Sequence, residues 1–192
     1  MAIVINGSGT VTGISVGGLP DGIVDDGTLA TDSVTAAKLK DDAIATGDLP
    51  AGSVLQVVSQ TSSILETSST SFVDMYSTTI TPSSTSSKIL IIATNHIYVT
   101  AYTSDNWRGA QIKLLRDATN IHDGGSYGTA AYLENSTDSY MTYSTFHLLD
   151  SPATTSEITY KLQGKSKVSD TVVFNNETYG DSGSITLMEI AG

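Results

Sequence analysis

Histidine is the residue type in this sequence that most often carries metal or acid–base chemistry. The three histidines, His96, His122 and His147, lie about 25 residues apart, without the short spacing of a metal motif. They could meet only in the tertiary structure, and the spacing gives no sign that they do. The chain has no cysteine, which excludes disulfides, thiolate catalysis and cysteine-ligated metal centres. The sequence therefore predicts no metal site and no cofactor.

Serine and carboxylate residues are the other candidates for catalysis. Asp123 follows His122 in a glycine turn, but neither the alternating acidic ligands of a calcium loop nor a nucleophile elbow accompanies it. The acidic residues of the C-terminal part do not form the carboxylate pair that glycoside hydrolysis needs, since Glu134, Glu157, Glu177 and Glu189 are each isolated. We therefore expect that the protein is not an enzyme.

Aromatic residues beside short polar side chains are a stronger signal, and it is one for binding. Aromatic rings stack on sugar rings, while Asp, Asn and Ser side chains hydrogen-bond to sugar hydroxyls. The same rings would equally pack in a core or between subunits. The candidate receptor contacts are Tyr102, Asp105, Asn106 and Trp107 in one segment, and Tyr127 and Tyr132 in the next.

Strand-like segments must position these candidates. They are rich in Val, Ile, Thr, Tyr and Phe and alternate with turn clusters, and no convincing helix follows residue 54. The predicted strands are Val54–Gln60, Ser71–Ile80, Lys88–Tyr102, Trp107–Arg116, Ser139–Leu149, Ser156–Leu162, Thr171–Asn175 and Ser184–Ile190. This pattern predicts a mainly β fold, a jelly-roll-like β-sandwich over residues 54–192, which we call the knob.

The N-terminal part has a different pattern, with a large aliphatic residue at every fifth position. Starting from Ile14, the series continues through Leu19, Val24, Leu29, Val34, Leu39, Ile44, Leu49 and Val54. A spacing of five advances about 140° around an α-helix, so these residues would not form one stripe. In a flat strand they would alternate between faces. The repeat therefore requires a turn in nearly every unit.

Residues 1–53 contain no aromatic residue and are too poor in large side chains to bury a core of their own. One interpretation is a disordered acidic linker. The other is a trimeric shaft, in which the repeated aliphatic residues of three chains share one axis. The regularity of the spacing favours the shaft. We expect three parts, a separate N-terminal segment at 1–20, a repeat shaft at 21–53 and the knob at 54–192.

The charge balance limits the partners. Nine basic residues against twenty acidic ones give a net charge of −11, which repels nucleic acid and anionic lipid. The longest apolar run, Ile89–Ala93, is far too short for membrane insertion, and the N-terminus lacks the features of a secretory signal. We expect a soluble protein that is made in the cytoplasm.

Several stretches of the sequence resemble fibre proteins of tailed bacteriophages, particularly those of cyanobacteria and other marine bacteria. They are the opening Met1–Ile14, the decapeptides around Lys38-Leu39, and the segments Ser69–Val73, Ile80–Leu90 and Leu187–Ile190. The resemblance implies a homotrimeric virion fibre, in the tail or on the capsid, with an N-terminal attachment segment, an intertwined shaft and a C-terminal knob. It implies no catalytic residues.

The leading hypothesis is a homotrimeric adhesin whose knob binds a host-surface glycan or lipopolysaccharide. Two alternatives are a capsid-mounted short fibre or decoration protein with a structural role and, ranked last, a polysaccharide-depolymerising spike. Attachment to other virion proteins would use the apolar residues of the glycine-rich start, Ile3, Val4, Ile5, Val11 and Ile14.

Overall fold

The computed structural model describes residues 44–100, 108–123, 131–133, 138–176 and 182–192, together with Leu29, Thr31, Val34, Thr35 and Leu39. The side chains of Thr46, Tyr132 and Leu133 lie outside this description. Contacts within the chain divide it into two units, residues 1–45 and 46–192. The second unit contains all of the strands described below.

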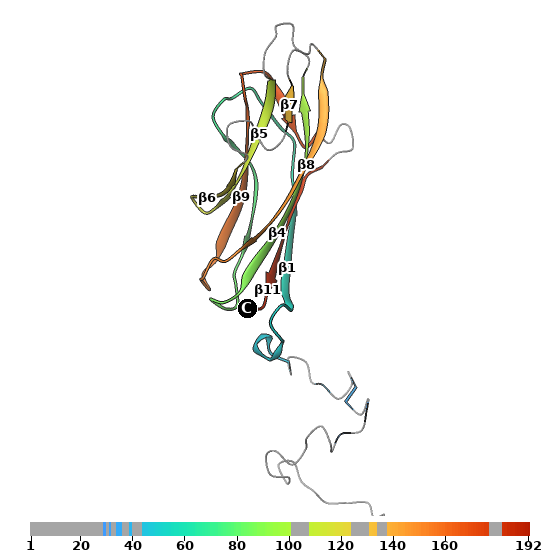
Figure 1. Ribbon diagram of the computed structural model, residues 1–192, viewed down its shortest axis with the longest axis vertical. Helices are drawn as coiled ribbons and strands as arrows, with labels where there is room; N and C mark the ends of the chain where they lie inside the picture. The colour runs from blue at the N-terminus through green and yellow to red at the C-terminus, as the bar shows by residue number, and fades with distance from the viewer. Residues whose placement is uncertain are drawn as a thin grey trace, which may run out of the picture. The chain divides into compact units, whose positions relative to one another are not determined.

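Two antiparallel sheets make up the second unit, after a short 3-10 helix, η2 (Thr46–Asp48). Sheet A contains β1 (Val54–Thr61), β2 (Leu65–Thr67), β4 (Lys88–Val99), β8 (Tyr140–Asp150), β10 (Val172–Phe174) and β11 (Ser184–Ile190). Sheet B contains β3 (Val73–Ile80), β5 (Arg108–Arg116), β6 (Thr119–Asp123), β7 (Ala131–Leu133) and β9 (Ile158–Ser166). Figure 1 shows β1, β11, β4 and β8 in one layer and β5, β6 and β9 in the other.

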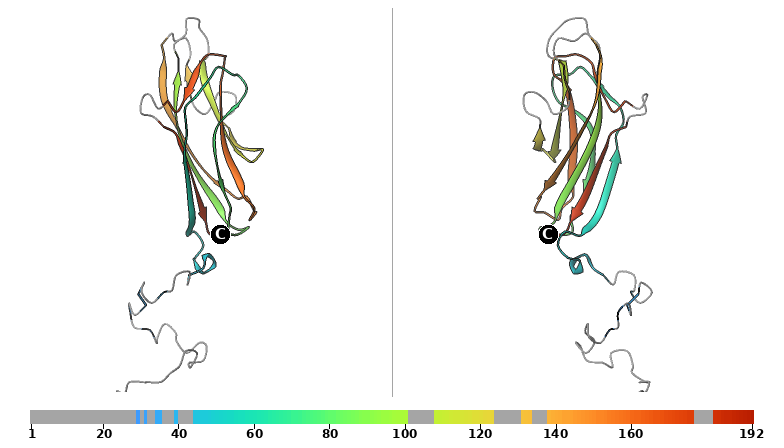
Figure 2. Two further views of the ribbon diagram at one scale, coloured as in Figure 1. Left: turned by 180° about the vertical axis from the view of Figure 1, so that it is seen from behind. Right: turned by 45° about the vertical axis from the view of Figure 1, so that its right-hand side comes forward.

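The strands pair in a nested order, first with last. β1 pairs with β11 and β2 with β10, β3 pairs with β9, β4 with β8, and β5 with both β6 and β7. The pairs are then joined through β11 and β10 to β4 in sheet A, and through β9 to β5 in sheet B. This nesting is the connectivity of a jelly roll. The views in Figure 2 show the two layers from other sides.

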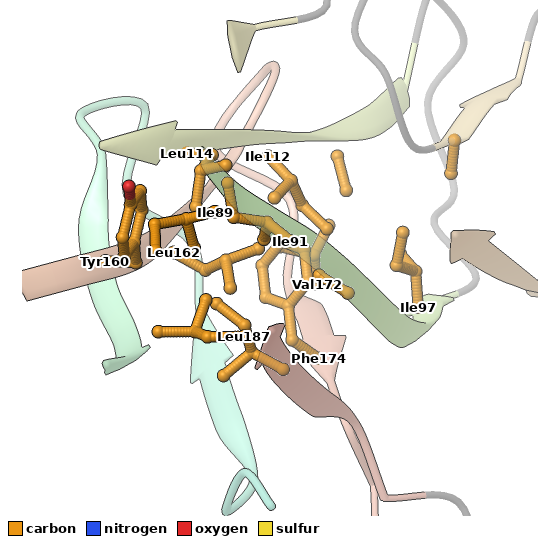
Figure 3. Packing of buried hydrophobic residues seen from close by; sticks show 14 of the residues in the cluster. Ile89, Ile91, Ile97, Ile112, Leu114, Tyr160, Leu162, Val172, Phe174 and Leu187 are labelled. Atoms are coloured by element: carbon orange, nitrogen blue, oxygen red, sulfur yellow. The ribbon is translucent and has the colours of Figure 1, made fainter. Parts of the chain in front are cut away.

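The core lies between the two sheets, and in β9 and the first half of β4 it is built by alternation of buried and outward residues. In β4, Ile89, Ile91 and Ala93 are fully buried, whereas Leu90 and Ile92 between them point outward. In β9 of sheet B, Tyr160 and Leu162 are likewise fully buried and belong to the same core. The side chains of both sheets point toward one another in Figure 3, where Phe174 and Leu187 of sheet A lie close to the sheet B residues.

A buried polar cluster lies where β4 changes partners from β11 to β10. The Tyr76 hydroxyl donates to Asn95 Oδ1 at 2.8 Å, and the His96 amide donates to Asn175 Oδ1 at 3.0 Å. Asn175 has a φ of 55°, a left-handed conformation that asparagine tolerates. A side chain at Gly183 would overlap Asn175, so this position requires glycine. Burial raises the pKa of Tyr76 and keeps its hydroxyl protonated as a donor.

Strand directions divide the connections between two ends of the sandwich. One end, which we call the base, holds the start of β1 and β4 and the end of β8 and β11, with the C-terminus beside the start of β1 (Figure 1). The other end, the loop end, holds the end of β4 and the starts of β5 and β8. Strands β2, β4, β7 and β9 end at the loop end.

The predicted mainly β fold with two antiparallel sheets is confirmed, and all eight predicted strands are present with boundaries shifted by a few residues. The sequence analysis missed three short strands, β2, β6 and β7, because each has five residues or fewer and lacks alternation long enough to recognise. Trimer and shaft involve other chains and stay predictions. The described residues form no helix of the length and apolar character that a membrane span needs.

Candidate functional site: the loop end of the sandwich

Arg108, the first residue of β5, ties the loop end together. Its side chain is buried, and its guanidinium donates to the Thr100 carbonyl at 2.7 Å and to the Asp138 carbonyl at 2.9 Å. Thr100 and Arg108 flank the segment 101–107, and Asp138 follows the segment 134–137. One buried cation thus fixes the chain at three points from which loop segments leave the sandwich.

Thr100 is held by a second set of contacts. Its amide and its hydroxyl both donate to the Thr171 carbonyl, at 3.2 and 3.0 Å, which links the end of β4 to the connection before β10. The Lys167 amide donates to the Gly109 carbonyl at 2.9 Å, so the same connection also touches the start of β5. The chain on both sides of segment 101–107 is therefore hydrogen-bonded to the connection between β9 and β10.

In the sequence, the predicted receptor contacts directly follow or precede residues of the loop end, or fall in or next to the strands β6 and β7 of sheet B. Tyr102, Asp105, Asn106 and Trp107 lie in 101–107, directly between Thr100 and Arg108, and Tyr127 lies in 124–130; these residues are outside the described part of the structure. Tyr132 falls in β7, where it pairs with Gly109 of β5. Their role as receptor contacts stays a prediction.

The three histidines lie in three different strands. His96 in β4 is buried, with Tyr143 across its edge at a ring distance of 5.3 Å, and His122 in β6 stacks on Phe146 at 5.2 Å. His147 in β8 is exposed and opposite Ile92. Within the described ranges, no three histidine, aspartate or glutamate side chains gather as metal ligands.

The outer face of sheet B carries a cluster of charged side chains. The Lys113 and Lys165 ammonium groups lie 4.3 and 4.8 Å from the centre of the Phe72 ring. Next to them, Lys161 forms an ion pair with Asp74 at 2.9 Å. Hydrogen bonds from Gln163 and Lys161 lower the pKa of Asp74 and keep it ionised at neutral pH.

At the base, a buried carboxylate organises the connection between β3 and β4. Glu189 is fully buried and accepts hydrogen bonds from the Gln56 amide at 2.6 Å and from the Ser83 amide and hydroxyl, both at 2.7 Å. Burial by itself would raise the pKa of Glu189, but hydrogen bonds from Gln56 and Ser83 outweigh it and lower the pKa. Glu189 is therefore a structural anion.

A small hollow of about 210 Å³ opens beside this carboxylate. Serines of the 81–87 connection and the C-terminal residues line it, together with two leucines; the lining residues are Gly47, Leu49, Leu55, Ser83, Ser84, Ser86, Ser87, Ala191 and Gly192. Two of the stretches that resemble phage fibres, Ile80–Leu90 and Leu187–Ile190, meet here through Ser83 and Glu189. The hydrogen bond from Ser83 to Glu189 therefore joins the two stretches at the base of the sandwich.

Sequence reasoning missed both organising residues. Glu189 was considered only as half of a catalytic pair, and Arg108 was not considered. A usable signal was present: each charged residue stands in an otherwise apolar or small-residue strand segment, where a charge is retained only if it is paired or hydrogen-bonded. Which partners they would find depends on segments remote in sequence.

Neither a protein-family model nor a curated protein matches the chain. Among solved structures, it is similar to the VP2 subviral particle of infectious bursal disease virus, with 18% identity and a TM-score of 0.42, over 71% of this chain and 33% of that one. The T13 particle of the same virus gives 12% identity and a TM-score of 0.41, over 73% and 36%. This chain thus spans about a third of those viral chains. With TM-scores below 0.5, these likenesses carry no argument about function.

Proposed function

We propose that the chain is a structural protein of a virion, a homotrimeric fibre whose C-terminal sandwich is an adhesin for a host-surface glycan or lipopolysaccharide. One observation carries the fibre part of the proposal. The repeated aliphatic residues in the described part of the chain are all exposed, from Leu49 at 38% to Ile44 at 53%, with Leu29, Val34 and Leu39 between. A regular series of large aliphatic side chains left in water needs partners to bury it.

A trimer suits this series because three copies bring identical aliphatic residues to one axis. Burying a side chain of this size stabilises by about 1.5–3 kcal/mol, and each repeat position would contribute three such side chains. The acidic charge does not oppose such packing if Asp and Thr face outward. The phage-fibre resemblance of the same segment supports this arrangement.

The mass of the full chain in solution tests the assembly. Light scattering should give about 60 kDa, three copies of the 20.0 kDa chain. Replacing Val34, Leu39 and Ile44 together with serine should lower the mass or expose residues 20–53 to protease. A monodisperse 20 kDa species for the natural sequence would contradict the fibre.

The adhesin part is supported by the loop end, where backbone carbonyls clamped by Arg108 flank the aromatic segment 101–107. A single weak site, on the order of millimolar, becomes useful when three sites on one particle bind together.

Binding to purified lipopolysaccharide and to an array of surface glycans tests this part. Tyr102→Ala, Asn106→Ala and Trp107→Ala are compared, each with its melting temperature. Loss of binding by folded variants supports the adhesin. Binding retained by all three folded variants would remove the segment from the receptor site, and a trimer without glycan binding would favour the structural alternative, a short capsid-mounted fibre.

A further inference from the structure

The outer face of sheet A carries one row of apolar side chains that crosses four strands. One row of directly paired outward residues runs over all four neighbouring strands: Val57 in β1, Met188 in β11, Leu90 in β4 and Leu149 in β8. At its two ends, Val57 and Leu149 are 55% and 52% exposed. Such a row on a single chain is a surface that water contacts unfavourably.

Further apolar side chains extend this row along the strands. Ile92 is 36% exposed on β4, and Tyr143 and Met141 are 59% and 55% exposed on β8. Between them the outward positions carry the exposed His147 and hydroxyls, including those of Thr94 and Thr145, which hydrogen-bond at 3.3 Å. Aromatic residues and methionine are enriched in interfaces between proteins.

The same face is almost free of charge. Within the described strands of sheet A, the outward charged residues are Lys88 at the base and Glu66 near the loop end. The other two charges of these strands, Asp150 and Glu189, are turned inward, where Arg116 and Ser83 bind them. The chain as a whole has a net charge of −11, so copies repel one another unless they meet through an uncharged surface.

The repeat of the N-terminal part continues into this face. Val54 is the last member of the five-residue series and the first residue of β1, where it pairs with Ile190 and is 51% exposed on the outer side. The aliphatic series that is proposed to pack between copies is thus continuous in the chain with the apolar row. We propose that the outer face of sheet A is where the sandwiches of neighbouring copies of this chain pack against one another. This inference rests on the fibre assembly proposed above.

Chemical protection of single cysteines in the full chain tests the inference, because the natural sequence has none. Val57→Cys and Leu149→Cys place a thiol on the outer face of sheet A, and Ser77→Cys and Thr79→Cys place one at exposed positions of β3 in sheet B. Each variant is treated with a maleimide, and its mass is measured by light scattering. We expect the sheet A thiols to react roughly tenfold or more slowly than the sheet B thiols in a multimer.

The other outcomes separate this inference from the proposed function. A multimer whose sheet A and sheet B thiols react equally fast would overturn the interface while leaving the fibre intact, and would leave the face for another protein. A 20 kDa species would overturn both, whatever its reactivity. Protection in such a monomer would mean that the chain covers this face with its own residues.

Discussion

The two ends of the sandwich are held by opposite chemistry. At the base, carboxylates accept the hydrogen bonds: Glu189 binds Gln56 and Ser83, and Asp150 binds Arg116 and the Tyr160 hydroxyl. At the loop end, the guanidinium of Arg108 donates to backbone carbonyls. At the base, the two carboxylates are held mainly by side-chain donors, whereas at the loop end the described bonds of Arg108 go to backbone carbonyls.

The two ends should differ in how well they tolerate substitutions. A backbone carbonyl is present whatever the residue, so the clamp of Arg108 would survive most substitutions in the flanking segments. At the base, by contrast, a change at Ser83 or Gln56 removes a partner of a buried carboxylate, which is costly. A sandwich built in this way can change its loop sequences while its base stays fixed.

The largest effect should come from breaking the loop-end clamp. Arg108→Met keeps much of the side-chain volume but leaves the Thr100 and Asp138 carbonyls without their donor. We expect a loss of about 3 kcal/mol in the free energy of unfolding, measured by urea denaturation. Arg108→Lys, which restores one donor at most, should lie between this variant and the natural protein. A change below 0.5 kcal/mol for Arg108→Met, roughly the effect of a surface substitution, would show that the carbonyls are solvated without the clamp.

The matching change at the base should be smaller. Glu189→Gln preserves the shape, but its amide group meets the Gln56 amide, so that two donors face each other. We expect a loss of about 1–3 kcal/mol. Asp74→Asn on sheet B is the control, because the Asp74 side chain is 58% exposed and its ion pair is worth at most about 1 kcal/mol. If Glu189→Gln and Asp74→Asn lost equal free energy of unfolding, the burial of Glu189 would not explain its contribution to stability.

Lowering the pH should destabilise the Glu189 end of the sandwich before it destabilises the loop end. The pKa of Glu189 is lower in the folded chain than its ordinary 4.5, so its contribution is present above that value and is lost as pH falls through the folded pKa. Arg108 stays charged throughout this range. Unfolding of the natural protein and of Glu189→Gln is compared between pH 7 and pH 3, and the variant should lose less stability. Parallel curves would exclude Glu189 as a source of acid sensitivity.

The smallest effect should follow removal of a single hydroxyl at the loop end. Thr100→Val deletes the 3.0 Å bond to the Thr171 carbonyl, while the Thr100 amide still donates to the same oxygen. We expect a loss of about 0.5–1.5 kcal/mol and an unchanged fold, seen as a small shift in melting temperature. A loss as large as that of Arg108→Met would mean that the hydroxyl, and not the guanidinium, holds this end.

Much of the fold followed from local pattern, because strand alternation is written in neighbouring residues. The stretch Lys88–Val99 reads as a strand without any knowledge of its partners, and the turn around Pro82 marks where it begins. The candidate site was less accessible. The aromatic segment Tyr102–Trp107 could be named, and it is attached to clamped strand ends, but the clamp itself joins Thr100, Arg108 and Asp138 across the fold.

The sequence by itself determined the longer strands, the absence of disulfides and the five-residue aliphatic series, since composition and spacing are properties of the chain alone. The tertiary structure decided which side of each strand is covered. Ile91 and Ile92 are identical residues side by side, yet one is fully buried and the other is 36% exposed on the outer face of sheet A. Likewise, Glu189 is isolated in sequence but becomes the centre of the base. Its partners Gln56 and Ser83 lie more than 100 residues away and meet it only when β1 and β11 pair.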